Sequence, residues 1–186
     1  MAELLIRENF LTPEDCRSFI ACYEENRPNL RRDTHDYWRD RVLYFNNMPE
    51  RDRAIKLRIR ELIYQQIELL HQHFAYSGPL YPETVNLVSW PQNLEMTPHV
   101  DQDNGFAQRM FAAVGYLNDD YEGGEIYFPE IDKSIKPKAG MLVAFHCGPK
   151  HRHGVRATSG NALRYTFPSW FTERKESIDR SFVDYR

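Results

Sequence analysis

Six short segments between residues 84 and 172 are rich in β-branched and aromatic residues, and they constrain the fold more than any other feature. Glycine, proline, asparagine and aspartate interrupt them at short intervals, which is typical of strands joined by turns. So many closely spaced short strands favour a sheet folded into two packed layers. The segments are Thr84–Trp90, Met110–Leu117, Glu125–Phe128, Met141–His146, Gly154–Thr158 and Leu163–Phe171.

Two segments with helical periodicity precede the strands. Thr12 is expected to cap a helix that begins at Pro13 and extends to about residue 26, with Asp15 returning the capping interaction. A second helix is predicted from residue 50 to about residue 75, because its apolar residues recur on one face. These residues are Ile55, Ile59, Leu62, Ile63, Ile67, Leu70 and Phe74.

Helices followed by strands predict an α+β fold in which the N-terminal helices support a double-stranded β-helix, that is, a jelly-roll or cupin-like barrel. We expect one domain over residues 1–186, with the helical support at about 12–76 and the barrel at about 84–172. Residues 175–186 are expected to form a loosely held end.

Composition narrows the class of protein. A formal net charge of −3 argues against a mainly electrostatic nucleic-acid binder. No apolar run is long enough for a membrane span, and the N-terminus does not have the pattern of a secretory signal. Three cysteines without metal-type spacing are expected to be free thiols in a reducing compartment. The chain is therefore predicted to be cytoplasmic, with no nucleic-acid or membrane partner; its oligomeric state stays open.

Residues 29–48 mix charged and aromatic side chains without a dominant period. One interpretation is a solvated loop that leads into a strand at Val42–Phe45. The other is a segment that faces a substrate, because loops on a rigid scaffold often carry recognition. Both interpretations stay open at the level of the sequence.

The pair His99-x-Asp101 has the chemistry of a metal site, although such pairs also arise by chance. Residues i and i+2 of an extended segment share a face, so both side chains can bind one ion. Two imidazoles and one carboxylate with open positions beside them are typical of non-haem Fe(II) oxygenases. A second histidine is therefore expected from the region between residues 146 and 153.

His153 is the predicted third ligand, with His151 in reserve and His146 less favoured. The turn composition Ser159-Gly160-Asn161 predicts a hairpin between residues 155–158 and 162–166. In either of its two registers, Arg164 would point to the same face as His153. A guanidinium on that face can hold a carboxylate in a bidentate pair, so an anionic ligand beside the metal is inferred.

These residues, together with further motifs, give the chain a resemblance to the 2-oxoglutarate- and Fe(II)-dependent dioxygenases, in particular to the prolyl 4-hydroxylase branch. Around the site it is most similar to the oxygen-sensing prolyl hydroxylases. Trp90 and Met96 stand where many collagen-type members have tyrosines, and Trp170 stands where the nucleic-acid demethylases have a second arginine. The motifs are His99-x-Asp101, Tyr116-Leu117-Asn118, Gly123-Gly124-Glu125, Pro137-Lys138-Ala139-Gly140, His153-x-Val155 and Arg164.

The resemblance implies an enzyme that uses Fe(II), 2-oxoglutarate and O2, with ascorbate as an accessory reductant. His99, Asp101 and His153 would be the iron ligands, and Arg164 and Tyr116 would hold the distal carboxylate of 2-oxoglutarate. The residues expected to border the substrate are Arg109, Trp170, Trp38 and Asn104.

Hydroxylation of a prolyl residue in a protein or peptide is the activity that the resemblance favours. A free amino acid or another small molecule is the alternative substrate. A binding module of the same fold without turnover is the second alternative, and substrate-dependent formation of succinate would separate it from both enzymes.

Overall fold

The computed structural model describes residues 3–32, 38–103, 105–178 and 180–183. Short 3-10 helices occur at Arg27–Asn29, Phe45–Asn47, Glu50–Asp52, Pro129–Ile131, Pro149–His151 and Lys175–Ser177. The α-helices are α1 (Pro13–Glu25), α2 (Arg53–Phe74) and α3 (Arg180–Val183). The strands are β1 (Leu5–Arg7), β2 (Val42–Tyr44), β3 (Tyr81–Trp90), β4 (Met96–His99), β5 (Arg109–Tyr116), β6 (Glu122–Gly123), β7 (Ile126–Phe128), β8 (Lys133–Ile135), β9 (Leu142–His146), β10 (His153–Val155), β11 (Thr158–Ser159) and β12 (Arg164–Thr172).

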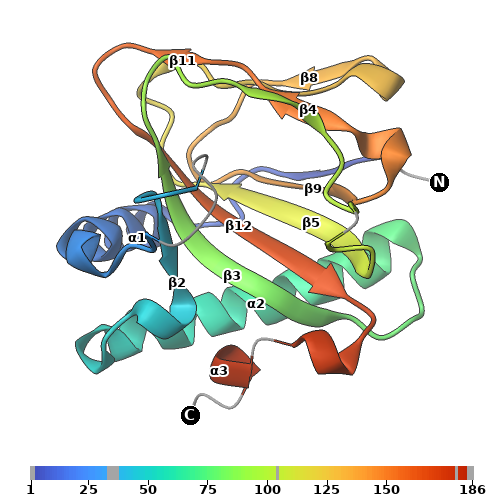
Figure 1. Ribbon diagram of the computed structural model, residues 1–186, viewed down its shortest axis with the longest axis horizontal. Helices are drawn as coiled ribbons and strands as arrows, with labels where there is room; N and C mark the ends of the chain where they lie inside the picture. The colour runs from blue at the N-terminus through green and yellow to red at the C-terminus, as the bar shows by residue number, and fades with distance from the viewer. Residues whose placement is uncertain (1–2, 33–37, 104, 179, 184–186) are drawn as a thin grey trace.

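The strands form two facing antiparallel sheets and a small two-stranded one. A six-stranded sheet has the order β1-β9-β5-β12-β3-β2, and a four-stranded sheet has the order β4-β10-β7-β8. The two-stranded sheet joins β11 to β6. Figure 1 shows α1 and α2 against one side of the large sheet and the β4 and β8 sheet on the other side. The predicted α+β double-stranded β-helix with external helices is confirmed.

Each side of the large sheet has its own apolar core because side chains alternate along its strands. On β5, Phe111 and Ala113 belong to the core beneath α1 and α2, whereas Ala112 and Tyr116 belong to the core between the two sheets. The predicted apolar stripe of α2 packs into the first of these cores. The second core surrounds the interior in which the predicted site residues lie.

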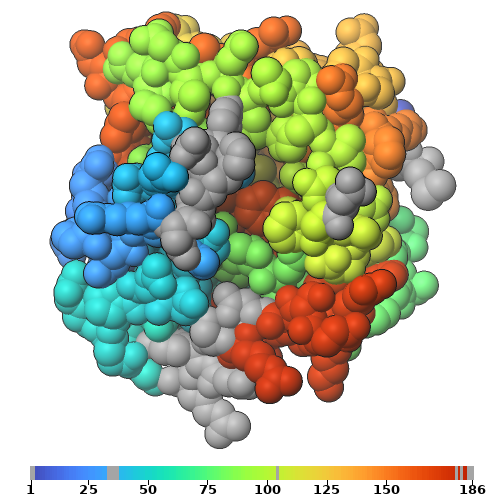
Figure 2. All heavy atoms as spheres, in the orientation of Figure 1, coloured from blue at the N-terminus to red at the C-terminus, as the bar shows by residue number. Residues whose placement is uncertain are grey.

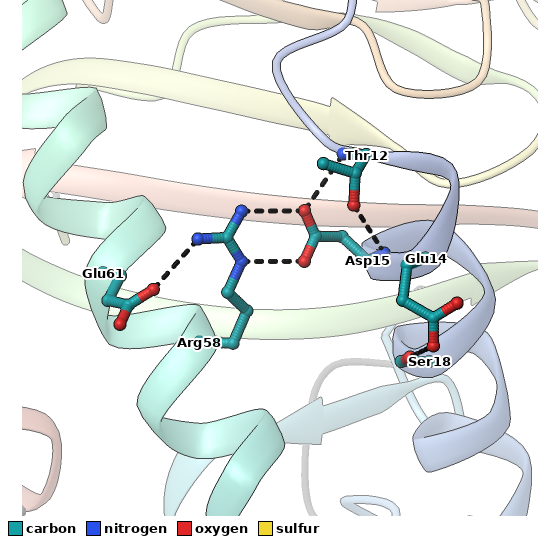
Figure 3. Close-up of polar contacts among 6 residues, drawn as sticks. All are labelled: Thr12, Glu14, Asp15, Ser18, Arg58 and Glu61. Carbon is teal, nitrogen blue, oxygen red and sulfur yellow. Dashed lines mark hydrogen bonds and ion pairs between the residues drawn. The ribbon is translucent and has the colours of Figure 1, made fainter.

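Helix α1 begins as its sequence indicates. Thr12 accepts a hydrogen bond from the backbone N–H of Asp15, and the Asp15 carboxylate accepts one from the backbone N–H of Thr12. Arg58 of α2 donates two hydrogen bonds of 2.8 and 2.9 Å to the same carboxylate (Figure 3). The cap of one helix therefore also joins it to the other helix.

Two expectations from the sequence are wrong. The segment 162–166 does not form a hairpin with 155–158, because β12 pairs with β3 and β5 of the large sheet. The expectation of a loosely held segment 175–186 is wrong at Phe182 of α3, which is fully buried with its ring centroid 5.0 Å from that of Phe45; residues 179 and 184–186 lie outside the described residues. A buried aromatic ring anchors this end through apolar burial.

Candidate metal centre

Three of the predicted site residues meet where β4 and β10 run side by side. His99 ends β4, His153 begins β10, and the two residues lie opposite each other in the antiparallel pair. Asp101 follows β4 by two residues. One ligand atom from each of the three side chains lies within 4.8 Å of the other two. Within the described part of the chain, this is the one group of histidine, cysteine and acidic residues with that geometry.

The spacing and orientation of these side chains suit a metal ion. The Nε2 atoms of His99 and His153 lie 3.6 and 4.0 Å from the two oxygens of Asp101, too far for strong hydrogen bonds. Each Nδ1 lies 3.1 Å from a backbone carbonyl, of Thr97 and His151 respectively. Because a carbonyl can only accept, Nδ1 carries the proton and each Nε2 presents a lone pair to the centre.

The pKa shifts favour the ligand forms of His153 and Asp101 at neutral pH, whereas the pKa of His99 is raised because its contact with the Asp101 carboxylate outweighs burial. Burial lowers the pKa of His153 to about 4, so its imidazole is uncharged. Burial opposes the charge on Asp101, but the imidazoles of His99 and His153 beside it keep the pKa of this carboxyl below its ordinary value. A carboxylate and a neutral imidazole are the forms that bind a divalent metal.

An interior chamber of about 60 Å³ adjoins this centre between the two sheets. Arg164 lines it with a side chain that is 5% exposed, and its guanidinium carbon lies 5.7 Å from the ring centroids of Trp90 and Tyr116. Neither Arg164 Nε nor the Tyr116 hydroxyl has a hydrogen-bond partner among the described residues. A buried cation without a counter-charge is costly, so the chamber has the chemistry of an anion site beside the metal centre.

A second, larger cavity of about 680 Å³ lies outside this chamber and shares several lining residues with it. Trp38, Trp170 and Arg109, three of the predicted substrate residues, line it. The ring centroid of Trp38 is 5.1 Å from that of Trp90 and 6.4 Å from that of Trp170. The molecule is hollowed at the centre of the face in Figure 2, where orange-red atoms of the chain segment that contains β12 lie recessed. Asn104 lies outside the described residues.

The structure separates the other two candidate histidines from the centre. The His146 ring packs on the helix side of the sheet, 4.7 and 4.4 Å from the ring centroids of Phe74 and Phe111. His151 is buried with its centroid 5.7 Å from that of His146, and it is outside the group of possible ligands. Of these three histidines, only His153 belongs to the group with His99 and Asp101.

Sequence reasoning missed several residues that line the interior chamber. Thr166 and Pro168 lie between Arg164 and Trp170 at alternate positions of β12, and all four line the chamber. The period of two along a strand is the signal that would have found them. Thr166 also accepts a hydrogen bond of 3.2 Å from the Trp90 indole, which fixes the ring beside Arg164.

Two histidines and one carboxylate on one face form the arrangement that non-haem Fe(II) oxygenases use. Residues 85–172 match the model of the 2OG-Fe(II) oxygenase superfamily. Among the described residues, no helix is both long and apolar enough to cross a membrane.

Curated relatives match part of the chain. Prolyl 3-hydroxylase 2 of Homo sapiens is 42% identical over 69 residues, which cover 34% of this chain and 10% of the relative. Prolyl 3-hydroxylase 1 of Gallus gallus is 34% identical over 96 residues, 49% of this chain and 13% of the relative. The matched part of the chain thus spans about a tenth of the length of these relatives.

Solved structures share the fold over nearly the whole chain. A viral collagen prolyl hydroxylase from Paramecium Bursaria Chlorella virus-1, in complex with 2OG, superposes with a TM-score of 0.71 at 19% identity, covering 94% of this chain and 97% of that one. A Trichoplax adhaerens prolyl hydroxylase, in complex with a hypoxia inducible factor peptide fragment, has the same TM-score and identity and covers 94% and 85%. At this identity the likeness concerns the fold.

Proposed function

We propose that this protein is a 2-oxoglutarate- and O2-dependent hydroxylase that acts on a prolyl residue in a protein or peptide. The observation that carries the proposal is that one interior holds both the group His99, Asp101 and His153 and the buried guanidinium of Arg164. A metal site alone would be compatible with many chemistries. A metal site joined to a buried anion site is suited to a metal-chelating dicarboxylate.

Each of these residues has a binding or orienting role in the proposed reaction. His99, Asp101 and His153 would hold Fe(II). Arg164 and Tyr116 hold the distal carboxylate of 2-oxoglutarate through charge-assisted and neutral hydrogen bonds. Iron with 2-oxoglutarate and O2 supplies the oxidation of a C–H bond, coupled to formation of succinate and CO2. No side chain has to act as a general base.

The apolar residues around the centre keep water away from the reacting atoms. Phe145, Ile126 and Val155 are buried in the wall of the interior chamber, and the ring centroid of Phe145 is 4.6 Å from that of His153. A dry wall of this kind strengthens the electrostatic interactions inside it. It also leaves the larger cavity as the side from which a substrate enters.

The size and position of the larger cavity support a polypeptide substrate over a small molecule. At about 680 Å³ it is far roomier than the interior chamber, and Trp38, Arg109 and Trp170 offer both stacking surfaces and hydrogen-bond donors to a chain. The curated relatives act on prolyl residues by name, and one of the solved structures is a complex with a peptide. The curated relatives are prolyl 3-hydroxylases, whereas the sequence motifs resemble the prolyl 4-hydroxylase branch, so product analysis has to assign the hydroxylated carbon.

The experiment is to incubate the protein with Fe(II), 2-oxoglutarate and ascorbate, and to compare proline-containing peptides with free proline. Succinate that forms only when a peptide is present supports the proposal. Turnover of free proline alone would assign a small-molecule substrate. If neither substrate increases the formation of succinate, the protein would instead be a binding module of the same fold. Asp101→Ala is the control for succinate formed by free iron.

We also propose that the protein works in a reducing compartment, the cytoplasm being the expected one. Cys16, Cys22 and Cys147 are all free and buried. Burial raises the pKa of each thiol, so none of them is a reactive thiolate at neutral pH. The fold thus uses its cysteines as small apolar side chains.

A further inference from the structure

Asn86 lies in β3, on the side of the large sheet away from α1 and α2. Side chains alternate along β3, so its neighbours Val85 and Leu87 pack into the core beneath the helices. Asn86 is 4% exposed and lines the larger cavity, together with His99 and Asp101 of the metal centre. The wall of the cavity that borders the metal centre therefore contains a buried amide.

The amide of Asn86 has no hydrogen-bond partner among the described residues. Its Oδ1 is enclosed by protein and unpaired. Its Nδ2 makes no hydrogen bond there either, but it is not one of the enclosed atoms, so it is the polar atom that Asn86 presents to the cavity. An unpaired buried amide costs free energy that a leucine of similar size would avoid. Stability of the fold therefore does not account for an asparagine here, whereas a ligand that accepts its N–H would.

Ser89, three positions further along the same strand, is a buried polar residue that the fold does satisfy. Its Oγ lies 2.8 Å from the hydroxyl oxygen of Tyr23 in α1, on the other face of the large sheet. Both Asn86 and Ser89 are less than a tenth exposed. They differ in whether the protein itself supplies a partner, which makes Ser89 a matched control.

Aromatic rings flank Asn86 in the cavity wall. Tyr44 of β2 lies opposite Asn86, and Trp170 of β12 lies opposite Thr84, two residues before Asn86 on the same face of β3. All four residues line the cavity. Rings on both sides of an N–H donor suit a residue that has an apolar ring and a carbonyl acceptor. Proline is such a residue: it has no backbone N–H, and the amide bond before it offers only a carbonyl oxygen.

We propose that Asn86 Nδ2 donates a hydrogen bond to a backbone carbonyl next to the target prolyl ring. This inference rests on the proposed function and names Asn86 as a substrate-binding residue that fixes the position of the ring relative to the metal centre. Oxidation of a C–H bond depends on the orientation in which that bond is held. Without the contact the ring can turn, so 2-oxoglutarate is consumed in turnovers that do not hydroxylate the peptide.

Asn86→Leu removes the donor and nearly keeps the size of the side chain. The Tm should stay unchanged or rise, because an apolar group replaces an unpaired buried amide. The Kd of a proline-containing peptide, measured by calorimetry on the metal-free protein, should rise about tenfold. With Fe(II) and 2-oxoglutarate present, a larger share of the succinate should form without hydroxylated peptide. A structural role alone would instead lower the Tm and leave this share unchanged.

Peptides in which sulfur replaces one carbonyl oxygen, on either side of the target proline, test the contact from the substrate. A thioamide is a weaker hydrogen-bond acceptor than an amide of nearly the same shape. At one of the two positions, the unmodified protein should bind the thioamide peptide about threefold to tenfold more weakly than the amide peptide. Asn86→Leu should bind both equally. Ser89→Ala, which loses its hydrogen bond with Tyr23, should have a lower Tm but keep the thioamide penalty.

The outcomes separate this inference from the proposed function. Succinate formation with the amide peptide, but the same thioamide ratios in the unmodified protein and in Asn86→Leu, would overturn the Asn86 contact and leave the hydroxylase standing. A lower Tm in Asn86→Leu with an unchanged peptide Kd would assign Asn86 to the fold and also overturn the contact. Turnover of free proline without any peptide would overturn both proposals. A thioamide penalty that disappears only in Asn86→Leu supports the contact.

Discussion

His153 and Arg164 lie on strands of different sheets, and their side chains line the same interior chamber. His153 begins β10 of the four-stranded sheet, whereas Arg164 begins β12 of the large sheet, directly opposite Trp90 of β3. The metal centre and the anion site are therefore brought together by the packing of one sheet on the other. Changes on either sheet can be expected to affect one half of the site without removing the other half.

Asp101→Ala should abolish tight metal binding while the protein stays folded. The variant removes the one carboxylate of the group and leaves two imidazoles, so the affinity for Mn(II) or Fe(II) should fall about a hundredfold or more. Competition titration with a chelating dye measures the affinity. Asp103→Asn, an exposed neighbour, should bind the metal as well as the unmodified protein does. A metal site that survives in Asp101→Ala would mean that other residues form it.

Arg164→Ala should weaken 2-oxoglutarate with little effect on the metal. Loss of a charge-assisted contact of about 1.5–3 kcal/mol corresponds to a KM for 2-oxoglutarate raised roughly tenfold to a hundredfold. Tyr116→Phe removes only a neutral hydroxyl and should raise the same KM by about threefold to tenfold. Exposed Arg152→Ala is the control for a changed surface charge. An unchanged KM in Arg164→Ala would refute the anion site.

Gly154→Ala should destabilise the protein and loosen the metal centre. An added Cβ would lie 2.7 Å from the backbone oxygen of Met96 and from the Tyr127 ring, so β10 and β4 would have to move apart. We expect a loss of about 1–3 kcal/mol in the free energy of unfolding, because overpacking forces the backbone to shift. The adjacent His153 should then bind metal less tightly.

Urea unfolding and metal titration measure the two effects of Gly154→Ala. Gly105→Ala is the matched control, since its added Cβ would meet only the Asp103 side chain at an ordinary 3.6 Å. Equal stability of the two variants would show that β4 and β10 do not pack as closely as described.

Asp15→Asn should lower stability at neutral pH by about 1–3 kcal/mol, because it breaks the charge-assisted contact with Arg58 and weakens the helix cap. The hydrogen bonds from Arg58 hold the pKa of the Asp15 carboxyl below its ordinary value of 3.8. A depressed pKa in the folded state means that the carboxylate stabilises the protein above pH 3.8 and stops doing so as the pH falls through its folded value.

Urea unfolding at neutral and acidic pH measures this difference. The gap between the unmodified protein and Asp15→Asn should be full at neutral pH and should shrink below about pH 3.8. Glu14→Gln, an exposed change on the same helix, should stay within about 0.5 kcal/mol. A gap that grows in acid would contradict the role given to Asp15 and Arg58.

Local features of the fold followed from the sequence because short-range interactions decide them. The capping box of Thr12 and Asp15 and the apolar stripe of α2 depend on residues three and four positions apart. Strand pairing depends on the whole chain, and for that reason the predicted hairpin is wrong: β12 lies between β3 and β5, and its paired residues are about 50 to 90 positions away in sequence. The side chains of His153 and Arg164 were predicted to share a face because of a hairpin that does not form. Both side chains nevertheless line the interior chamber.

The period of two along a strand accounts for part of the remaining site. Thr166 and Pro168 follow from the period of two once Arg164 is placed. Trp38 was expected to border the substrate from composition alone, and the structure places it between the two cavities.

The most direct test of the central claim is mass spectrometry of a proline-containing peptide after reaction under isotopically labelled dioxygen. The protein, Fe(II) and 2-oxoglutarate should place one labelled oxygen atom on a prolyl residue and one in succinate, in equal amounts. Asp101→Ala should place none. A peptide whose mass does not change, with labelled oxygen in free proline instead or in no product at all, would contradict the assignment of this protein as a prolyl hydroxylase of polypeptides.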